Sequence, residues 1–196
     1  MKTGILGGTF DPIHNGHLTI AEEAMKTYQL DRILFMPAGN PYLKSEVTDY
    51  ETRARMVESA IEGIPCYTLS RLEDSTENTY TFETLHALHT LYPDDTLYFI
   101  VGADSVLHME NWRCPEAIFR SCIILAARRP GYRDTGLISK IEELRKRFEA
   151  DIRMLPCEAV DVSSTSIRAN LREGKGIRDM VPESVARYIA EHSLYL

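Results

Sequence analysis

The chain has 196 residues, 44% of them hydrophobic, which is enough for one domain with a sizeable core. Its formal net charge of −7 argues against general binding to nucleic acid, which requires a basic surface, although a small phosphate site needs only local cations and amides. No apolar run approaches the roughly 20 residues that span a bilayer, and Met1 leads straight into a strand pattern without a signal peptide. We therefore expect a cytoplasmic protein with no membrane or nucleic acid partner.

Short apolar runs alternate with helical patterns, which predicts βαβ units around a parallel sheet. In chain order the sequence predicts a strand over Thr3–Leu6, a helix over His17–Tyr28, a strand over Arg32–Met36, helices over Tyr50–Glu62 and Thr81–Leu91, a strand over Thr96–Val101, a helix over Cys114–Arg120, a strand over Cys122–Ala126, a helix over Gly136–Ala150 and a strand over Ile152–Leu155. The helix over 136–150 is expected to bury a stripe made of Ile138, Ile141, Leu144 and Phe148.

The remainder of the chain, Ser163–Leu196, is expected to be helical, with short helices over Ser163–Asn170 and Pro182–Glu191. The predicted fold class is therefore α/β, a Rossmann-like doubly wound parallel sheet with a small C-terminal helical segment. We expect a single domain over residues 1–196, made of an α/β core over 1–162 and a helical segment over 163–196.

Four cysteines, Cys66, Cys114, Cys122 and Cys157, lie far apart in the sequence. None belongs to a Cys-x-x-Cys pair, so we expect no zinc site. The thiols are predicted to be reduced and mainly structural.

Four segments directly follow predicted strands. They are the turn after Leu6, Pro37–Lys44, Gly102–Ser105 and Arg128–Gly131. Ligands of parallel α/β sheets bind beyond the carboxyl ends of the strands, where the strand order reverses. We therefore expect these four segments to converge on one ligand site.

Residues 7–17, with the sequence Gly-Gly-Thr-Phe-Asp-Pro-Ile-His-Asn-Gly-His, form a glycine–histidine segment between the first strand and the first helix. Glycines let the backbone approach an anion closely, and the unpaired N–H groups of a first helical turn favour negative charge. His14 and His17 are three apart and share one helix face. The segment lacks the Gly-Lys-Ser/Thr of a P-loop and the G-x-G-x-x-G spacing of a dinucleotide fingerprint. We interpret it as a polyphosphate site, although a surface or cap role is the ordinary alternative for a single histidine.

Residues 162–168, Val-Ser-Ser-Thr-Ser-Ile-Arg, form a serine segment that predicts a second anion site. Its hydroxyls suit the N-cap of a helix, and Arg168 lies close enough in sequence to act with the free amides that follow the cap. Hydroxyls, amides and a guanidinium together suit a terminal phosphate. The alternative is a helix that is merely well capped.

The two segments resemble signatures of the nucleotidylyltransferase superfamily, in which a His-x-Gly-His element binds ATP phosphates and a Ser-Ser-Thr-x-Ile-Arg element follows near the C-terminus. Within it, the chain most resembles the bacterial nicotinate-nucleotide adenylyltransferases. Three further segments support this, in the family's order: residues 80–85, Tyr-Thr-Phe-Glu-Thr-Leu; residues 102–105, Gly-Ala-Asp-Ser, with Trp112 after them; and residues 127–131, Ala-Arg-Arg-Pro-Gly.

The resemblance implies adenylyl transfer in the biosynthesis of NAD. The 5′-phosphate of nicotinate mononucleotide would attack the α-phosphorus of ATP, giving deamido-NAD and pyrophosphate without a covalent enzyme intermediate. Mg²⁺ would be the cofactor, bound mainly through ATP rather than by a protein metal site. Catalysis would rest on holding two anions in line and neutralising their charge.

The resemblance also implies residue roles. ATP would be bound by Gly7, Gly8, Thr9, Phe10, His14, His17, Lys44, Gly102, Asp104, Ser164, Thr165 and Arg168. Among these, His14, His17 and Arg168 are the implied catalytic residues. The acceptor nucleotide would be bound by Lys44, Tyr80, Thr81, Trp112 and Arg129. For Arg129 a salt bridge within its loop is the alternative.

The chain departs from the family in one loop. Where the family usually has Pro-Pro-His-Lys, residues 41–44 are Pro-Tyr-Leu-Lys, so only Lys44 of this loop is carried over.

Two alternative functions stay open. Another acceptor, such as phosphopantetheine or nicotinamide mononucleotide, would use the same two phosphate segments, although Tyr80, Thr81 and Trp112 favour a flat pyridine ring. A module that senses ATP or NAD and regulates a partner would bind nucleotide without releasing pyrophosphate. The sequence leaves a homo-oligomer open.

Overall fold

The computed structural model describes residues 1–40, 47–75, 79–128, 136–156 and 160–196. Its centre is a six-stranded sheet in the order β3-β2-β1-β4-β5-β6, and every pair of neighbours is parallel. The strands are β1 (Lys2–Gly8), β2 (Arg32–Pro37), β3 (Tyr67–Leu69), β4 (Thr96–Gly102), β5 (Ile123–Ala127) and β6 (Ile152–Leu155). The five predicted strands are confirmed, each with bounds shifted by at most two residues at an end.

The sequence prediction missed β3. This strand has three residues, pairs only with β2 at the edge of the sheet, and has no fully buried side chain. A run this short carries too little periodicity to be told from a loop.

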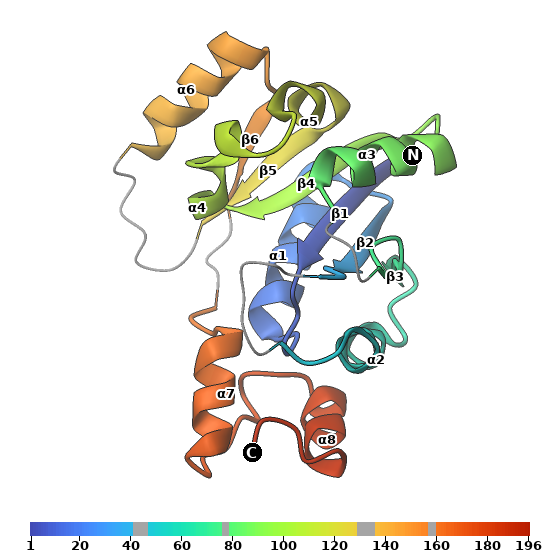
Figure 1. Ribbon diagram of the computed structural model, residues 1–196, viewed down its shortest axis with the longest axis vertical. Coiled ribbons are helices and arrows are strands. Elements are labelled where there is room, and N and C mark those ends of the chain that lie inside the picture. Colours follow the sequence, from blue (N-terminus) through green and yellow to red (C-terminus); the bar gives the residue numbers. More distant parts are fainter. Residues whose placement is uncertain (41–46, 76–78, 129–135, 157–159) are drawn as a thin grey trace.

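Helices cover both faces of the sheet (Figure 1), which confirms the Rossmann-like doubly wound fold. The helices of the core are α1 (Asn15–Tyr28), α2 (Tyr50–Ile61), α3 (Thr81–Leu91), α4 (Ala103–Val106), α5 (Pro115–Ser121) and α6 (Leu137–Phe148), with a 3-10 turn, η1, over Met109–Asn111. Adjacent strand residues pack into opposite cores: Leu6 and Phe35 face the side of α1 and α2, whereas Ile5 and Leu34 face the side of α3 to α6. The short α4 and η1 were not predicted.

The buried stripe of α6 differs by one position from the prediction. Leu137, Ile141, Leu144 and Phe148 are buried, whereas Ile138 is 53% exposed. The observed residues repeat at intervals of four and three, which keeps them on one face, and Ile138 is turned about 100° away from Leu137. The prediction for Ile138 was therefore wrong.

Two further helices, α7 (Ser164–Arg172) and α8 (Glu183–Glu191), lie beyond the carboxyl end of β1 (Figure 1). The Ser184 hydroxyl in α8 donates to the Ser59 carbonyl of α2 at 2.8 Å. The Asn15 side chain, at the start of α1, donates to the carbonyl of Asp179 at 3.0 Å. These bonds fasten the helical segment to the elements that flank the end of β1.

Three cysteines, Cys66, Cys114 and Cys122, are free thiols, as predicted, and burial raises the pKa of Cys122 to about 12. Cys157 lies outside the described residues. None of the helices in the described ranges combines the length and apolar character that crossing a bilayer requires.

A buried guanidinium joins the loops that follow β1 and β2. Arg53 of α2 is 1% exposed, and it donates to the carbonyls of Thr9 at 2.7 Å, Thr48 at 2.8 Å and Ala38 at 2.8 Å. A second bond from its Nη2 reaches the Gly39 carbonyl at 3.3 Å. Because buried carbonyls need a donor that water does not supply, the arginine is the group that satisfies them.

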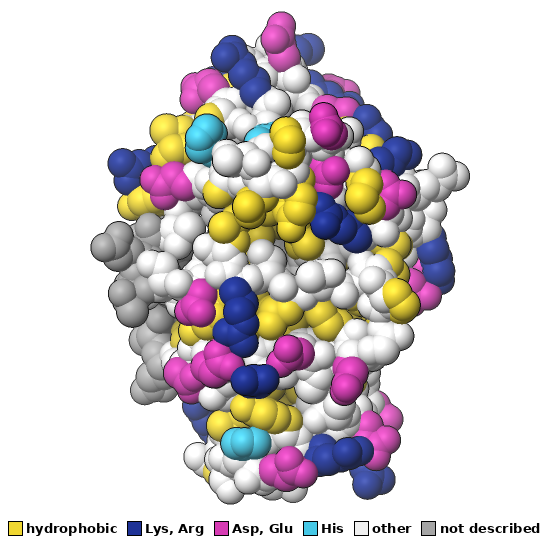
Figure 2. Space-filling view, turned by 90° about the vertical axis from the view of Figure 1, so that its right-hand side faces the viewer, with side chains coloured by type: hydrophobic (Ala, Val, Ile, Leu, Met, Phe, Trp, Pro, Cys, Tyr) yellow, Lys and Arg dark blue, Asp and Glu magenta, His cyan; other side chains and the backbone are white. Residues whose placement is uncertain are grey.

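We expect Arg53→Met to lower the free energy of unfolding by about 3 kcal/mol, because each buried carbonyl left without a donor costs about 1–3 kcal/mol. Urea denaturation followed by circular dichroism measures the change. Arg55→Met is the matched control, because Arg55 is exposed on the same helix and pairs with Glu51 and Glu58. Basic and acidic side chains likewise lie side by side on the face of the molecule drawn in Figure 2. Such exposed pairs contribute about 1 kcal/mol or less, so equal midpoints for the two variants would contradict the role of Arg53.

Candidate active site

A cavity of about 850 Å³ lies where β1 and β4 end and the strand order reverses. Nine predicted site residues line it: Gly7, Gly8, Thr9, His17, Tyr80, Thr81, Gly102, Asp104 and Trp112. Residues proposed for the ATP side and for the acceptor side thus share one space, as expected from strand topology. Lys44 and Arg129 lie outside the described residues.

The glycine turn is shaped by the ring of Phe10. Phe10 has a positive φ of 52° and is 1% exposed, so its side chain points into the core behind the turn. A Cβ atom on Gly8 would lie 3.1 Å from two atoms of this ring, which is tighter than most real Cβ contacts. Phe10 therefore supports the backbone at Gly8 from behind and does not line the cavity.

His14 and His17 meet as predicted from their spacing. Their rings stack with centroids 3.7 Å apart and an interplanar angle of 27°. His14 is 7% exposed and does not line the cavity, whereas His17 does. The rings of His17 and Phe10 meet in a T-shaped arrangement with their centroids 4.9 Å apart. A Cβ on Gly16 would come within 3.1 Å of the His14 ring, so the glycine between the histidines makes room for the stack.

A hydrogen bond determines the tautomer of the neutral His17 ring. Its Nδ1 accepts from the backbone N–H of His14 at 3.2 Å. A nitrogen that accepts cannot carry a proton, so the neutral ring bears its proton on Nε2. In its neutral form, His17 therefore carries its N–H donor at Nε2.

The start of α1 is less open to anions than the sequence predicts. The N–H of His14 is bonded to His17, and the N–H of Asn15 donates to the Met180 carbonyl at 2.9 Å. The N–H of His17 donates to the His14 carbonyl at 2.9 Å. The expectation that the first turn offers unpaired N–H groups is therefore wrong at these three positions, because the His17 ring, the Met180 carbonyl and the His14 carbonyl accept from them.

The serine segment packs directly against the glycine–histidine segment. Ser163 caps α7 by accepting from the N–H of Ser166 at 3.1 Å, as predicted for a helix cap. The Ser164 hydroxyl donates to the Pro12 carbonyl at 2.9 Å, and Nη1 of Arg168 donates to the Asp11 carbonyl at 2.7 Å. Residues more than 150 positions apart in the chain are thereby brought together.

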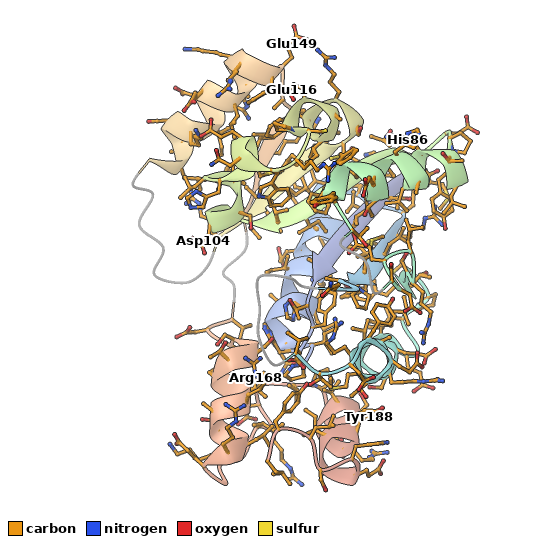
Figure 3. The ribbon with its side chains drawn as sticks, in the orientation of Figure 1. His86, Asp104, Glu116, Glu149, Arg168 and Tyr188 are labelled. Carbon is orange, nitrogen blue, oxygen red and sulfur yellow. The ribbon has the colours of Figure 1, made fainter. Side chains whose placement is uncertain are left out.

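Arg168 and its neighbours do not line the 850 Å³ cavity, but they border the same turn. Figure 3 shows Asp104 on α4 and Arg168 on α7, both on the side of the molecule where the strands end. Thr165 and Asp104 are exposed, and Ser164 is half-buried. Gly102 has open space around its Cα, because a Cβ atom added there would meet no atom of the described residues within 4 Å, its chain neighbours aside.

The wall of the cavity that carries the residues predicted to bind the acceptor is aromatic. The Trp112 ring meets Phe99 edge-on at 6.4 Å, and the Tyr80 backbone N–H donates to the Glu83 carboxylate at 3.3 Å at the start of α3. Trp112 is half-buried, so it combines a core contact with a surface facing the cavity.

Two charged residues of this wall were not found by sequence reasoning. Arg113 lies with its guanidinium carbon 4.4 Å from the centre of the Tyr80 ring. Glu73 accepts from the Thr84 hydroxyl at 2.7 Å, and burial raises the pKa of its carboxyl. The one sequence signal for Arg113 is that it directly follows Trp112. Glu73 lies alone in a loop and has no such signal.

Comparisons with known proteins identify the family of the chain. A family model described as cytidylyltransferase-like matches residues 5–170. The "Probable nicotinate-nucleotide adenylyltransferase" of Lachnoclostridium phytofermentans is 41% identical over 198 residues, covering 100% of this chain and 99% of that protein. The protein of the same name from Dehalococcoides mccartyi is 40% identical over 199 residues, covering 100% and 97%.

A solved structure shares the fold. The nicotinic acid mononucleotide adenylyltransferase of Plasmodium falciparum complexed with NaAD has a TM-score of 0.80 at 22% identity, covering 100% of this chain and 98% of that chain. With a family model over most of its length and relatives near 40% identity over all of it, the chain belongs to the cytidylyltransferase-like family and, within it, to the nicotinate-nucleotide adenylyltransferases.

Proposed function

We propose that this enzyme joins the adenylyl group of ATP to nicotinate mononucleotide within the cavity at the ends of β1 and β4. An oxygen of the acceptor's 5′-phosphate forms a bond to the α-phosphorus, and the bond from that phosphorus to the bridging oxygen of pyrophosphate breaks. The observation that carries this proposal is the shared cavity, in which the glycine turn and His17 face the aromatic wall of Tyr80, Thr81 and Trp112. Deamido-NAD and pyrophosphate are the products.

On the ATP side we assign contacts to the glycine turn, the histidine pair and α7. The backbone of Gly7 to Thr9 lets phosphate approach closely, and the Nε2–H of His17, held by its bond to His14, is a preorganised donor toward charge that develops on the phosphates. We assign Ser164, Thr165, Arg168 and Lys44 to the β- and γ-phosphates. Gly102 and Asp104 would line the adenosine part of the site.

Mg²⁺ enters as part of the Mg-ATP substrate. Within the described ranges, no group of three or more His, Cys, Asp or Glu side chains could hold a metal ion, so we assign its ligands to the phosphate oxygens of ATP. Bound there, the ion lowers the negative charge of the leaving pyrophosphate. No general base is required, since a phosphate dianion is already nucleophilic near neutral pH.

On the acceptor side, Trp112 and Tyr80 offer flat surfaces for the pyridine ring, and the start of α3 at Thr81 offers backbone donors to its carboxylate. Arg113 over the Tyr80 ring adds a positive charge to the same wall. A negative ring substituent is favoured there over a neutral amide. We assign Arg129 to the acceptor phosphate.

The assignment is tested by measuring pyrophosphate release with Mg-ATP and three acceptors in turn: nicotinate mononucleotide, nicotinamide mononucleotide and phosphopantetheine. We expect the highest kcat/KM with nicotinate mononucleotide. An equal or higher value with phosphopantetheine would reject the acceptor proposed here. Nucleotide binding without pyrophosphate release in any of the three would favour the sensing module.

We expect His17→Ala to lower kcat about 100-fold, the loss typical of removing one preorganised donor to a developing charge. Steady-state kinetics gives the change, and circular dichroism checks the fold. His86→Ala is the matched control, because His86 is exposed on α3, away from the cavity lining (Figure 3). A folded His17→Ala enzyme with kcat near that of the control would refute the role of His17.

Arg113→Gln should reduce the preference for the acid over the amide acceptor. We expect the ratio of the two kcat/KM values to fall about fivefold, which corresponds to the roughly 1 kcal/mol of an exposed charge pair. Arg120→Gln on α5 removes an equally exposed arginine that does not line the cavity. If both variants keep the wild-type ratio, Arg113 has no part in selecting the acid.

A further inference from the structure

The second-last residue of the chain reaches into the glycine–histidine segment. The Tyr195 hydroxyl donates to Oδ1 of Asp11 at 2.6 Å, and the Tyr195 ring packs against the core on the side of α1 and α2. Asp11 is 3% exposed, so its carboxylate depends on protein donors rather than on water.

Three separate parts of the chain contact Asp11. Besides Tyr195, its Oδ2 accepts from the backbone N–H of Thr48 at 3.4 Å. Nη1 of Arg168 lies 4.0 Å from the same oxygen, while donating to the Asp11 backbone carbonyl at 2.7 Å. The carboxylate and Arg168 are therefore neighbours that stop short of a close ion pair.

If the Asp11 carboxylate lost one of its hydrogen-bond donors, the cation that it would attract is Arg168. Arg53 is also near, but four of the five N–H groups of its guanidinium are already given to the carbonyls of Thr9, Thr48, Ala38 and Gly39. Within the described ranges, the bond to the Asp11 carbonyl is the one hydrogen bond made by the Arg168 side chain, which is 25% exposed. Its remaining N–H groups can turn either to Asp11 or to a ligand.

We propose that Tyr195 is a positioning residue for Arg168: by occupying the Asp11 carboxylate, its hydroxyl prevents Arg168 from closing onto that carboxylate and keeps the guanidinium for the ATP phosphates. The proposal rests on the ATP-binding role proposed above for Arg168. It adds a residue at the far end of the chain to the determinants of ATP affinity.

Tyr195 is suited to this task because it stays protonated. Burial and the hydrogen bond to Asp11 both raise the pKa of its phenol, so the Tyr195 hydroxyl keeps its proton near neutral pH. A phenylalanine would keep the ring and its packing and remove only the donor.

The test is binding of Mg-ATP without acceptor, measured by calorimetry. We expect Tyr195→Phe to raise the Kd about tenfold, and in turnover assays to raise the KM for ATP while leaving the KM for nicotinate mononucleotide within twofold. Tyr28→Phe is the matched control, because the Tyr28 hydroxyl also makes a 2.6 Å bond, to the Met154 carbonyl, at the side of β6. An unchanged Kd in Tyr195→Phe, or an equal rise in both variants, would overturn the proposal.

A second comparison separates positioning from plain loss of structure. In an Asp11→Asn background the charge that attracts Arg168 is absent, so adding Tyr195→Phe should change the Kd for Mg-ATP by less than twofold. If Tyr195→Phe costs the same factor in both backgrounds, its effect is additive and the coupling through Asp11 is refuted.

The test of Tyr195 does not depend on which acceptor the enzyme uses, because the Kd for Mg-ATP is measured without an acceptor. If the wild-type enzyme binds Mg-ATP and releases no pyrophosphate with nicotinate mononucleotide, the proposed function fails, while the Kd values still decide the role of Tyr195. If Arg168→Ala leaves the Kd for Mg-ATP unchanged, the phosphate role of Arg168 fails, and the Tyr195 proposal fails with it.

Discussion

The hydrogen bonds from α7 to the carbonyls of Asp11 and Pro12 are the constraint on which the site depends. The sheet by itself brings together only the turns that follow its strands. Neither the sheet nor α1 supplies a guanidinium beside the carbonyls of Asp11 and Pro12. The bonds from Ser164 and Arg168 to these two carbonyls place the Arg168 guanidinium beside the turn. They also fix the distance of the guanidinium from the histidine stack, because the two carbonyls and His14 belong to the same short stretch of chain.

Arg53 performs the complementary task on the inner side of the turn. It holds the carbonyls of Thr9 and Ala38, one after β1 and one after β2, so the two loops cannot move independently. Phe10 fills the space beneath Gly8. The side of the turn that faces the cavity can therefore expose its backbone, because Arg53 and Phe10 support the turn from the opposite side. Rigid support under an exposed backbone is what a site working by charge stabilisation requires.

Much of the fold could be predicted from the sequence, because buried parallel strands and amphipathic helices carry local periodicity. The meeting of His14 and His17 followed from helical spacing, and the packing of the serine segment near the first turn was implied by resemblance. What could not be predicted depends on contacts between distant residues. The use of the Asn15 N–H by Met180, the clamp of Arg53 and the bond from Tyr195 to Asp11 leave no pattern in the neighbouring sequence. β3 and α4 are too short to carry one.

The contact between Tyr195 and Asp11 links two residues that lie 184 positions apart in the sequence. A contact of this kind closes a very long loop, and the entropy of closing that loop must be lost before the contact contributes any stability. When the chain refolds from denaturant, we therefore expect the surroundings of Asp11 to be completed late, after local elements such as α1 have formed.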